Sequence, residues 1–243
     1  MIDLHSHILP QQDDGAQSLE QALSMADMAA ESGVRTMVAT PHCADDRRQE
    51  IYSAWKMLSQ ALQELHIPVK LYLGMEIYGT PDTARLLREG KLYTLNGSRY
   101  PLLEFDFHSD GWEETRILEN VCAEGFRPLV AHPERYSYLW EEPRLLRRWH
   151  AMGCLFQVNR GSILGRFGSG AQQMAGRMLE AGLVTVVASD AHSDRVRTPW
   201  MADVRRLLRE EFSQEYARLL LEENPRRIIN NEEIPPAQPV GFA

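Results

Sequence analysis

The sequence predicts a parallel α/β fold in which one sheet closes, or nearly closes, into a barrel. Seven short apolar runs alternate along the chain with segments whose apolar residues recur at helical spacing. Strands that alternate with helices pair in parallel, and both faces of such a sheet have to be buried. A barrel surrounded by helices is the natural way to bury them.

Each predicted strand ends at or just before a polar residue. The seven strands are predicted at residues 2–5, 36–40, 69–75, 100–104, 128–131, 154–158 and 184–189. The first helix has clear end signals, because Ser18 and Gln21 form a capping box and Gly33 stops the helix. The later helices are predicted at residues 47–65, 83–88, 113–124, 143–152, 171–181 and 201–212. No linker divides the chain, so we expect one domain over residues 1–229 and an extended Pro-rich tail at residues 230–243.

The charge balance is acidic, since 34 Asp and Glu against 26 Lys and Arg give a net charge of −8. Nucleic acid and anionic membrane surfaces reward a basic footprint, so neither is expected as a partner. The three cysteines form no C-x-x-C pair, which argues against a disulfide framework and a thiolate zinc site. The sequence shows no signal-peptide pattern and no apolar run of about 18 residues, so we expect a cytoplasmic protein without membrane insertion. Its oligomeric state stays open.

Histidines and carboxylates recur at the ends of six of the seven predicted strands. They are His5, His7, Asp14, His42, Glu76, Glu104, His132, Asp190 and His192. Active sites of α/β barrels lie at the carboxyl ends of the strands, so these side chains should converge on one face. A single His-x-His pair is more often a surface or core feature than a metal site. Its repetition around the barrel favours metal ligation.

The donor set combines imidazole and carboxylate without thiolate, which suits Mn²⁺, Fe²⁺ or Zn²⁺ at a catalytic site. Nine ligands are too many for one ion. Four carboxylates bring a formal charge of −4, which is costly to bury without cations. Three divalent ions would leave about +2, and a positive, water-binding pocket suits an anionic substrate such as a phosphoester.

The strand-end motifs resemble those of a known superfamily. They are Asp3-Leu-His5-Ser-His7, Asp13-Asp14-Gly15, Thr40-Pro-His42, Gly74-Met-Glu76-Ile-Tyr78, Leu103-Glu104-Phe105, Ala131-His132-Pro-Glu134-Arg135-Tyr136, Gln157-Val-Asn159 and Ser189-Asp190-Ala-His192. This set is similar to the PHP (polymerase and histidinol phosphatase) superfamily. More narrowly, it resembles the bacterial manganese-dependent protein-tyrosine phosphatases of capsule and exopolysaccharide synthesis. The resemblance implies the PHP fold, a distorted TIM-like barrel of seven β/α units, and three divalent metal ions.

The resemblance also implies roles for individual residues. His5, His7, Glu76 and Asp190 would hold the first metal ion, while Asp14, His42 and His192 would hold the third. Glu76 would bridge to the second ion, which Glu104 and His132 would hold. The expected ions are Mn²⁺, with iron or zinc as alternatives. Arg135 and Arg197 match arginines that assist the phosphate, with Arg195 as a competitor for the second role, and Asp14 is counted with the catalytic residues.

The expected reaction is hydrolysis of phosphotyrosine by direct attack of a metal-bound hydroxide, without a phosphoenzyme. Cys43 follows a candidate ligand but lacks the phosphate-cradling loop of thiolate phosphatases. The resemblance implies a phosphotyrosyl protein as partner, namely the tail of a bacterial tyrosine kinase that regulates polysaccharide synthesis. Two alternatives remain, a PHP phosphatase of a small metabolite such as histidinol phosphate, and a non-catalytic, metal-stabilised interaction module.

Overall fold

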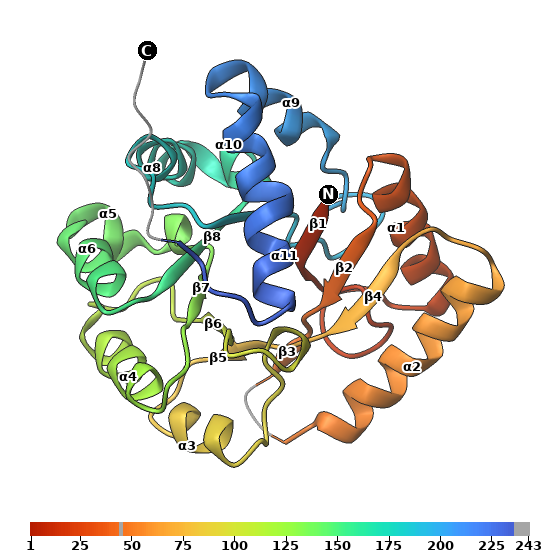
Figure 1. The fold of residues 1–243 in the computed structure, drawn as a ribbon, viewed down its shortest axis with the longest axis horizontal. Helices are drawn as coiled ribbons and strands as arrows, with labels where there is room; N and C mark the ends of the chain where they lie inside the picture. The colour runs from red at the N-terminus through yellow and green to blue at the C-terminus, as the bar shows by residue number, and fades with distance from the viewer. Residues whose placement is uncertain (44–45, 236–243) are drawn as a thin grey trace.

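A computed structural model describes residues 1–43 and 46–235 of the chain. Its strands are all parallel and form two sheets (Figure 1). The first sheet has the order β1-β2-β4, with β1 at Ile2–Ser6, β2 at Thr36–Ala39 and β4 at Lys70–Leu73. The second has the order β3-β5-β6-β7-β8-β9, from β3 at His42–Cys43, β5 at Glu76–Tyr78 and β6 at Leu102–Glu104 to β7 at Leu129–Ala131, β8 at Leu155–Asn159 and β9 at Val186–Ala188.

Two of the seven predicted strands, at residues 36–40 and 69–75, are each followed in the structure by a second short strand that lies beyond the predicted end. Only Thr40 and Pro41 separate β2 from β3, and only Gly74 and Met75 separate β4 from β5. Proline cannot donate to a strand ladder. At Gly74 a Cβ atom would lie 3.1 Å from the side chains of Leu95 and Val38, so the chain packs too closely there for most other residues. These breaks pass the chain from one sheet to the other.

Backbone contacts join the first and last strands. Ser6 forms an isolated parallel bridge with Ala191, His7 N donates to Ala191 O at 2.8 Å, and Asp190 N donates to His5 O at 3.0 Å. The seven strand positions therefore follow one another in chain order from β1 round to β9. The parallel α/β fold predicted from the sequence is confirmed, and the single bridge and the two breaks account for its distorted shape.

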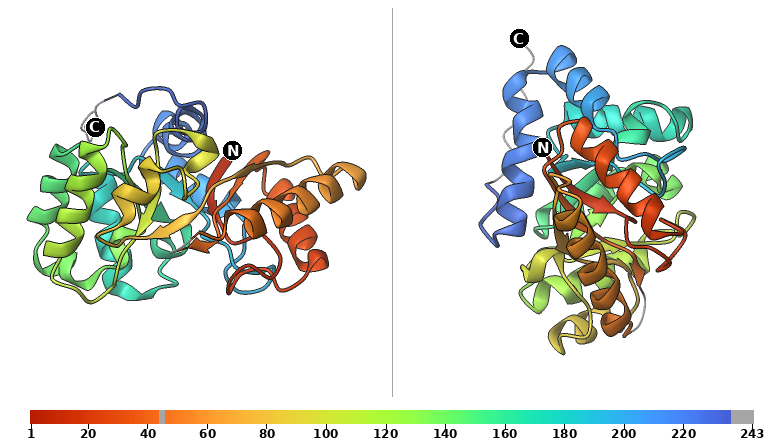
Figure 2. Two further views of the ribbon diagram at one scale, coloured as in Figure 1. Left: turned by 90° about the horizontal axis from the view of Figure 1, so that it is seen from below. Right: turned by 90° about the vertical axis from the view of Figure 1, so that its right-hand side faces the viewer.

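Helices surround the strands, as Figures 1 and 2 show. They are α1 (Leu19–Glu31), α2 (Arg48–Glu64), α3 (Thr83–Arg88), α4 (Trp112–Ala123), α5 (Ser137–Glu141), α6 (Arg144–Ala151), α7 (Arg160–Ile163), α8 (Gly168–Glu180) and α9 (Ala202–Glu211), with short 3₁₀ turns η1 (Leu95–Gly97) and η2 (Pro133–Arg135). Ser18 caps α1 by accepting a hydrogen bond from Gln21 N, as the capping box predicts. Among the described residues, no helix has the length and apolar character needed to span a membrane.

A helical segment that the sequence analysis did not predict lies across the amino-terminal end of the barrel (Figure 2). It consists of α10 (Gln214–Arg218), a π-helical turn η3 (Leu219–Glu223) and α11 (Asn224–Ile229). Ile228 and Ile229 pack against the barrel interior, in one cluster with Leu4, Leu102 and Leu129. Residues 230–235 continue along the same end, where Tyr100 Oη donates to Glu232 O at 2.6 Å. The rest of the predicted tail, residues 236–243, lies outside the described residues.

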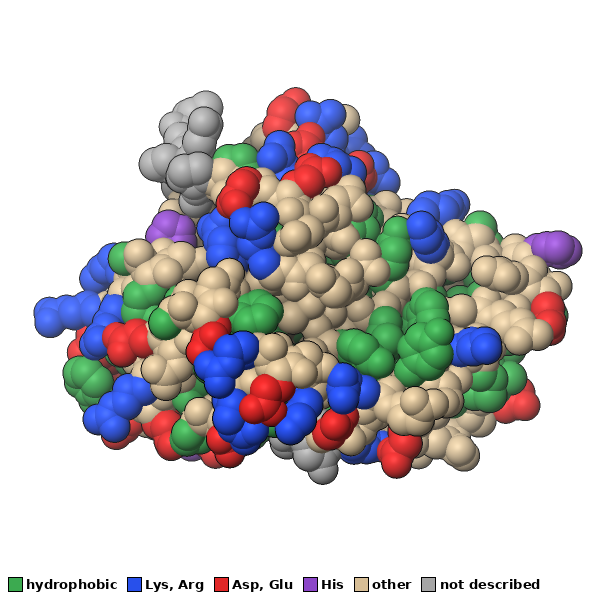
Figure 3. Space-filling view, turned by 60° about the horizontal axis from the view of Figure 1, so that its bottom comes forward, with side chains coloured by type: hydrophobic (Ala, Val, Ile, Leu, Met, Phe, Trp, Pro, Cys, Tyr) green, Lys and Arg blue, Asp and Glu red, His purple; other side chains and the backbone are tan. Residues whose placement is uncertain are grey.

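The strands are buried on both sides, as a parallel sheet requires. Val38, Leu155 and Val186 belong to the same buried apolar cluster as Ile228 and Ile229 of α11. A larger apolar cluster fills the space between the strands and the outer helices. On the face drawn in Figure 3, basic and acidic side chains are intermixed, with smaller hydrophobic patches between them. The α11 segment closes one end of the barrel, so the opposite end is available for a site.

Candidate metal centre

The structure brings all nine candidate side chains together at the carboxyl ends of the strand positions. Their potential ligand atoms form four overlapping groups, and within each group these atoms lie within 4.8 Å of one another. The groups are His7, Asp14, His42 and His192; His5, His7 and Asp190; His5, Glu76 and His132; and His42, Glu76 and Glu104. Shared members join the four groups into one cluster.

Hydrogen bonds fix the orientation of the two histidines of β1. His5 Nδ1 lies 2.8 Å from Gln157 Oε1, and His7 Nδ1 lies 2.7 Å from Asp13 Oδ2. Both partner atoms are acceptors, so each ring carries a proton on Nδ1 and turns Nε2 inward. The two Nε2 atoms are 3.1 Å apart. Each therefore presents a lone pair to the same small volume, which suits a cation.

Two carboxylate oxygens face the same volume. Glu76 Oε2 lies 3.2 Å from Nε2 of both His5 and His7, and Asp190 Oδ1 lies 3.5 Å from both. Both oxygens are buried and meet no hydrogen-bond donor of good geometry among the described residues. A buried carboxylate oxygen without a donor is costly unless a cation neutralises it. The four atoms thus fit a metal ion.

Glu76 also belongs to the second part of the cluster. Its Oε1 lies 3.0 Å from His132 Nε2, and its Oε2 lies 3.0 Å from His42 Nδ1. Glu104 faces the same two rings, with Oε1 3.4 Å from His132 Nε2 and Oε2 3.3 Å from His42 Nδ1. Glu76 therefore lies at the centre of the cluster, with one oxygen facing His132 and the other facing His5, His7 and His42.

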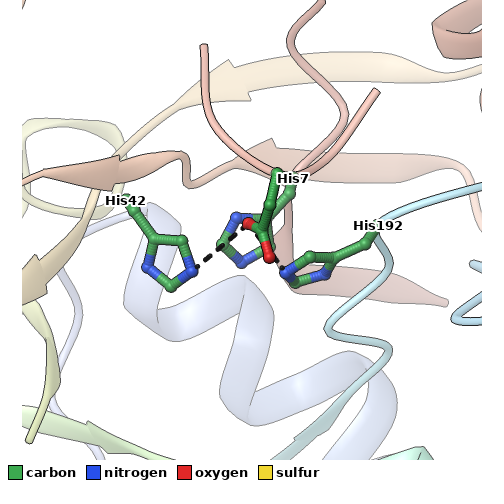
Figure 4. A group of neighbouring side chains, drawn as sticks. His7, His42 and His192 are labelled. Carbon is green, nitrogen blue, oxygen red and sulfur yellow. Dashed lines mark ion pairs between the residues drawn. The ribbon is translucent and has the colours of Figure 1, made fainter. Parts of the chain in front are cut away.

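The third part of the cluster is the most open. Asp14 Oδ1 lies 3.4 Å from His192 Nε2 and 3.6 Å from His42 Nε2, and the Asp14 side chain is 67% exposed. Figure 4 shows the rings of His7, His42 and His192 turned toward one another. His192 Nδ1 lies 3.1 Å from the backbone oxygen of Asp190, which leaves Nε2 directed to Asp14. This side of the cluster is where water and substrate can enter.

The backbone at the site departs from ordinary strand geometry. Asp190 and His132 have φ values of 51° and 33°, in the left-handed region that non-glycine residues seldom adopt. Such positions cost about 1–3 kcal/mol and concentrate at functional sites. Gly15 is required for a different reason, since a Cβ atom there would lie 2.1 Å from His7 O and 2.9 Å from Asp13 Oδ1. The absence of a side chain lets this loop hold Asp13 against His7.

Burial and pairing act in opposite directions on the charges of the cluster. Burial raises the pKa of Glu104, but hydrogen bonds with His132 and His42 bring it down to about 2. Burial lowers the pKa of His132, whereas hydrogen bonds with Glu104 and Glu76 raise it to about 10. Without cations, a proton on the His132 imidazole offsets part of the carboxylate charge. The cluster therefore requires positive charge, which metal ions would supply in place of this proton.

Two arginines reach the cluster from separate loops. Arg135 Nη1 lies 3.5 Å from Asp190 Oδ2, and Arg197 Nη2 contacts the same oxygen. Arg195 is exposed, and its backbone nitrogen bonds to Ser193 Oγ on the surface. Of the two arginines left open by the sequence, Arg197 is the one that lies at the cluster.

Some residues that support the cluster were not assigned a role from the sequence. Asp13 orients His7, while Gln157 orients His5 and donates through Nε2 to Asn159 Oδ1 at 2.7 Å. Asn159 Nδ2 in turn donates to Asp190 Oδ2 at 2.5 Å. The sequence does contain a signal for two of these supporting roles. Gln157 and Asn159 lie two residues apart on β8, so their side chains project to the same face of the strand.

A barrel whose rim gathers imidazoles and carboxylates is typical of metal-dependent hydrolases. A sequence profile of the capsular polysaccharide synthesis family CpsB/CapC matches residues 1–230, and the chain belongs to this family. It is 33% identical to the tyrosine-protein phosphatase YwqE of Bacillus subtilis (strain 168), over 99% of this chain and 96% of the relative. It is 32% identical to the tyrosine-protein phosphatase CpsB of Streptococcus pneumoniae, over 96% of this chain and 99% of the relative.

The fold is shared with a solved structure at the same level of similarity. Crystal structures are known of YwqE from Bacillus subtilis and CpsB from Streptococcus pneumoniae, which are described as metal-dependent tyrosine phosphatases. One of these chains superposes on this structure with a TM-score of 0.91 and 33% identity, covering 100% of both chains. The family membership predicted from the strand-end motifs is thus confirmed.

Proposed function

We propose that this chain is a metal-dependent protein-tyrosine phosphatase of capsule or exopolysaccharide synthesis. One observation supports this most directly: two buried histidine nitrogens and two buried carboxylate oxygens face one another beside two arginines, and within residues 1–43 and 46–235 no hydrogen bond reaches these oxygens. The first set of atoms suits a cation, and the arginines suit a tetrahedral anion. The names of the relatives at about 33% identity favour phosphotyrosine as the source of that anion.

The donor atoms suit three divalent ions, with Mn²⁺ as the first candidate and iron or zinc as alternatives. His5, His7, Glu76 and Asp190 would hold one ion, while Glu104 and His132 would hold a second together with Glu76. Asp14, His42 and His192 would hold the third. The positive charge of three divalent ions also exceeds the negative charge of the four carboxylates. The pocket would therefore be positive and would attract a phosphate ester.

Divalent ions bound there would supply a nucleophilic water at neutral pH and polarise the phosphoryl oxygens. Arg135 and Arg197 would bind the outer oxygens of the transferring phosphoryl group and stabilise its developing charge. Asp14 is the most exposed of the nine residues, and with Oδ1 facing the third ion its other carboxylate oxygen would accept a proton from an entering water. The phenol hydroxyl of tyrosine has a pKa of about 10, well below that of an alkyl alcohol. Its phenolate is therefore the better leaving group and needs less protonation by a general acid.

The natural partner would be a phosphotyrosyl protein, in particular the tail of a bacterial tyrosine kinase that regulates polysaccharide synthesis. The open side at Asp14 and His42 is compatible with a side chain on a flexible segment, because both are partly exposed. We propose the cytoplasm as the place of this reaction.

A substrate comparison tests the proposal. Full-length protein loaded with Mn²⁺ is assayed on a phosphotyrosyl peptide and on histidinol phosphate, and kcat/KM is compared. We expect turnover of the peptide, a clear preference for it over the metabolite, and complete loss of turnover after chelation. A preference for histidinol phosphate would transfer the function to a small-metabolite phosphatase. Absence of all turnover, with chelation lowering only the melting temperature, would leave an interaction module.

A further inference from the structure

The two arginines of the site share an aromatic support. The Arg135 guanidinium carbon lies 4.4 Å from the ring centroid of Phe167, and that of Arg197 lies 5.5 Å from the same ring. Arg135 also lies over the ring of Phe107, at 4.7 Å from its centroid. Guanidinium groups within about 6 Å of an aromatic centroid are attracted by the ring quadrupole. One phenylalanine therefore contacts both cations that face Asp190.

The ring of Phe167 is itself held in place by the backbone. A Cβ atom on Gly161 would lie only 2.5 Å from Phe167 Cε2, so the ring packs directly on this glycine. Gly161 belongs to α7, which begins at the residue after Asn159 of β8. The position of the ring is thereby tied to the strand that also orients Asp190 through Asn159.

Phe107 is fixed just as firmly. Its backbone oxygen accepts hydrogen bonds from Ser137 N at 3.0 Å and from Ser137 Oγ at 2.9 Å. Its ring stacks with that of His132, with 5.7 Å between the centroids and 23° between the planes. The support of Arg135 is thus connected to a candidate metal ligand.

An arginine side chain on a loop loses considerable rotamer freedom when it binds an anion. Two adjacent guanidiniums also repel each other, and at the site the shared anionic partner of both is Asp190 Oδ2. Rings that already hold the guanidiniums would reduce the ordering cost and keep both arginines directed at one point. A leucine in place of Phe167 would fill similar space without attracting a cation.

We propose that Phe167 is a positioning residue that holds Arg135 and Arg197 together for binding the phosphoryl group, with Phe107 as a second support for Arg135. This inference rests on the proposed phosphatase function. It assigns to Phe167 no contact with the metal ions. Its effect is expected on phosphate binding and on kcat/KM, with metal content unchanged.

The test uses full-length, Mn²⁺-loaded protein and the Phe167→Leu variant. We expect kcat/KM on a phosphotyrosyl peptide to fall about 30-fold, from two ring contacts of ordinary strength. Inhibition by inorganic phosphate should weaken in parallel. Phe167→Trp, which keeps an aromatic face, should recover most of the loss. Phe126→Leu, at a half-buried phenylalanine before β7, is the matched control and should behave as wild type.

Two further variants separate positioning from folding. Gly161→Ala keeps Phe167 but displaces its ring, so it should lower kcat/KM in the same way as Phe167→Leu. It replaces Phe167→Leu as the test if that variant does not fold. In a background that already carries Arg135→Ala and Arg197→Ala, Phe167→Leu should have no further effect. Wild-type kcat/KM in Phe167→Leu, failure of tryptophan to restore it, or an undiminished loss in the arginine-free background would overturn the proposal.

Direct calorimetric titration with inorganic phosphate distinguishes this inference from the proposed function. If wild-type protein hydrolyses no phosphotyrosine, the function fails, but the role of Phe167 is still decided by phosphate binding. Weaker phosphate binding by Phe167→Leu than by wild type would support the role. Equal binding by the two proteins, or no binding by wild type, would contradict it.

Discussion

At the scale of single residues, Arg135 is placed to act on the substrate while leaving the metal ligands intact. Its side chain is partly exposed and reaches Asp190 from outside the histidine cluster. We expect Arg135→Ala to lower kcat by about 10²–10³, because a donor to the developing charge is lost. Metal content and melting temperature should be retained. Steady-state kinetics with Arg195→Ala as the surface control would check this, and a wild-type rate in Arg135→Ala would remove the residue from the site.

Asp13 should matter for metal binding although it is not a proposed ligand. Its Oδ2 accepts from His7 Nδ1 at 2.7 Å and from His42 N at 2.9 Å. Burial raises the pKa of Asp13, but the hydrogen bond with His7 brings it down to about 2, so the residue is ionised at neutral pH. Asp13→Asn should weaken Mn²⁺ binding about 10- to 100-fold, as losses of such supporting partners do. Equilibrium dialysis would measure this, with Asp27→Asn as control; equal affinity in both variants would refute the role.

The sequence was sufficient to gather the nine candidate residues but could not assign the residues that orient them. Polar residues at the ends of apolar strands stand out, since the strand pattern itself places them on the rim. Asp13 adjoins Asp14, and only the three-dimensional turn at Gly15 shows which carboxylate faces His7. From the sequence alone, Phe167 cannot be distinguished from an ordinary apolar packing residue. Its contact with both arginines depends on loops that spacing does not predict.

At the scale of elements, one ion pair links the strand side of the site to the loop that carries Arg197. Arg160 at the start of α7 is nearly fully buried and bonds Asp203 of α9 through Nε at 2.7 Å and Nη2 at 2.5 Å. Its Nη1 also donates to Thr198 O at 3.3 Å. This pair therefore fixes the segment between Arg197 and α9.

Asp203→Asn should leave the Arg160 charge buried without a full partner. We expect a loss of roughly 1–3 kcal/mol in the free energy of unfolding, kept small by the partial exposure of Asp203. Burial raises the pKa of Asp203, but Arg160 holds it below its usual value. The carboxylate therefore stabilises the fold above a pH of about 4, and the contribution is lost as the pH falls further.

Urea unfolding at several pH values would check this expectation. The gap in stability between wild type and Asp203→Asn should close in acid. Asp46→Asn, which removes an exposed ion pair with Arg48, should cause no measurable change. A gap that stays constant down to acid pH would show that the Asp203 charge does not stabilise the fold.

The helices near residue 229 could not be predicted from local sequence patterns. The seven predicted strands and the longer helices between them follow from local apolar spacing, whereas the short helices α5 and α7 were not predicted. By contrast, α10, η3 and α11 form one segment in which a π turn shifts the helical period and Pro225 resembles a helix breaker. In the structure Pro225 is the second residue of α11, which directly follows the π turn η3. The segment is stabilised by the barrel end that it covers.

At the scale of the whole molecule, metal binding and folding should be coupled. Protons compete with metal ions for the same atoms, and the pKa of His132 is raised to about 10 in the absence of cations. Saturating Mn²⁺ at 100 times its Kd would add about 2.7 kcal/mol to the free energy of unfolding. For a chain of this length that corresponds to roughly 5–10 °C in Tm. The gain should still be rising with pH at pH 8, because His132 keeps its proton up to a pH of about 10 in the absence of cations, and it should shrink as the pH falls toward 5.

Thermal unfolding with and without chelator across this pH range would measure the coupling. The sign follows from the ligands, because lower pH protonates the imidazoles that the ions need. A Tm that ignores chelation at pH 8, or a gain from Mn²⁺ that grows in acid, would contradict the coupling. The melting temperature of the chelated protein serves as the reference at each pH.

We propose that nine side chains from separate strand ends hold a cluster of divalent ions. Crystals grown with excess Mn²⁺ and measured at the manganese absorption edge would count the ions directly. We predict three anomalous peaks: one among His5, His7, Glu76 and Asp190, one between Glu104 and His132, and one among Asp14, His42 and His192. A map without peaks among these side chains, from crystals grown in excess Mn²⁺, would show that they do not form a metal centre.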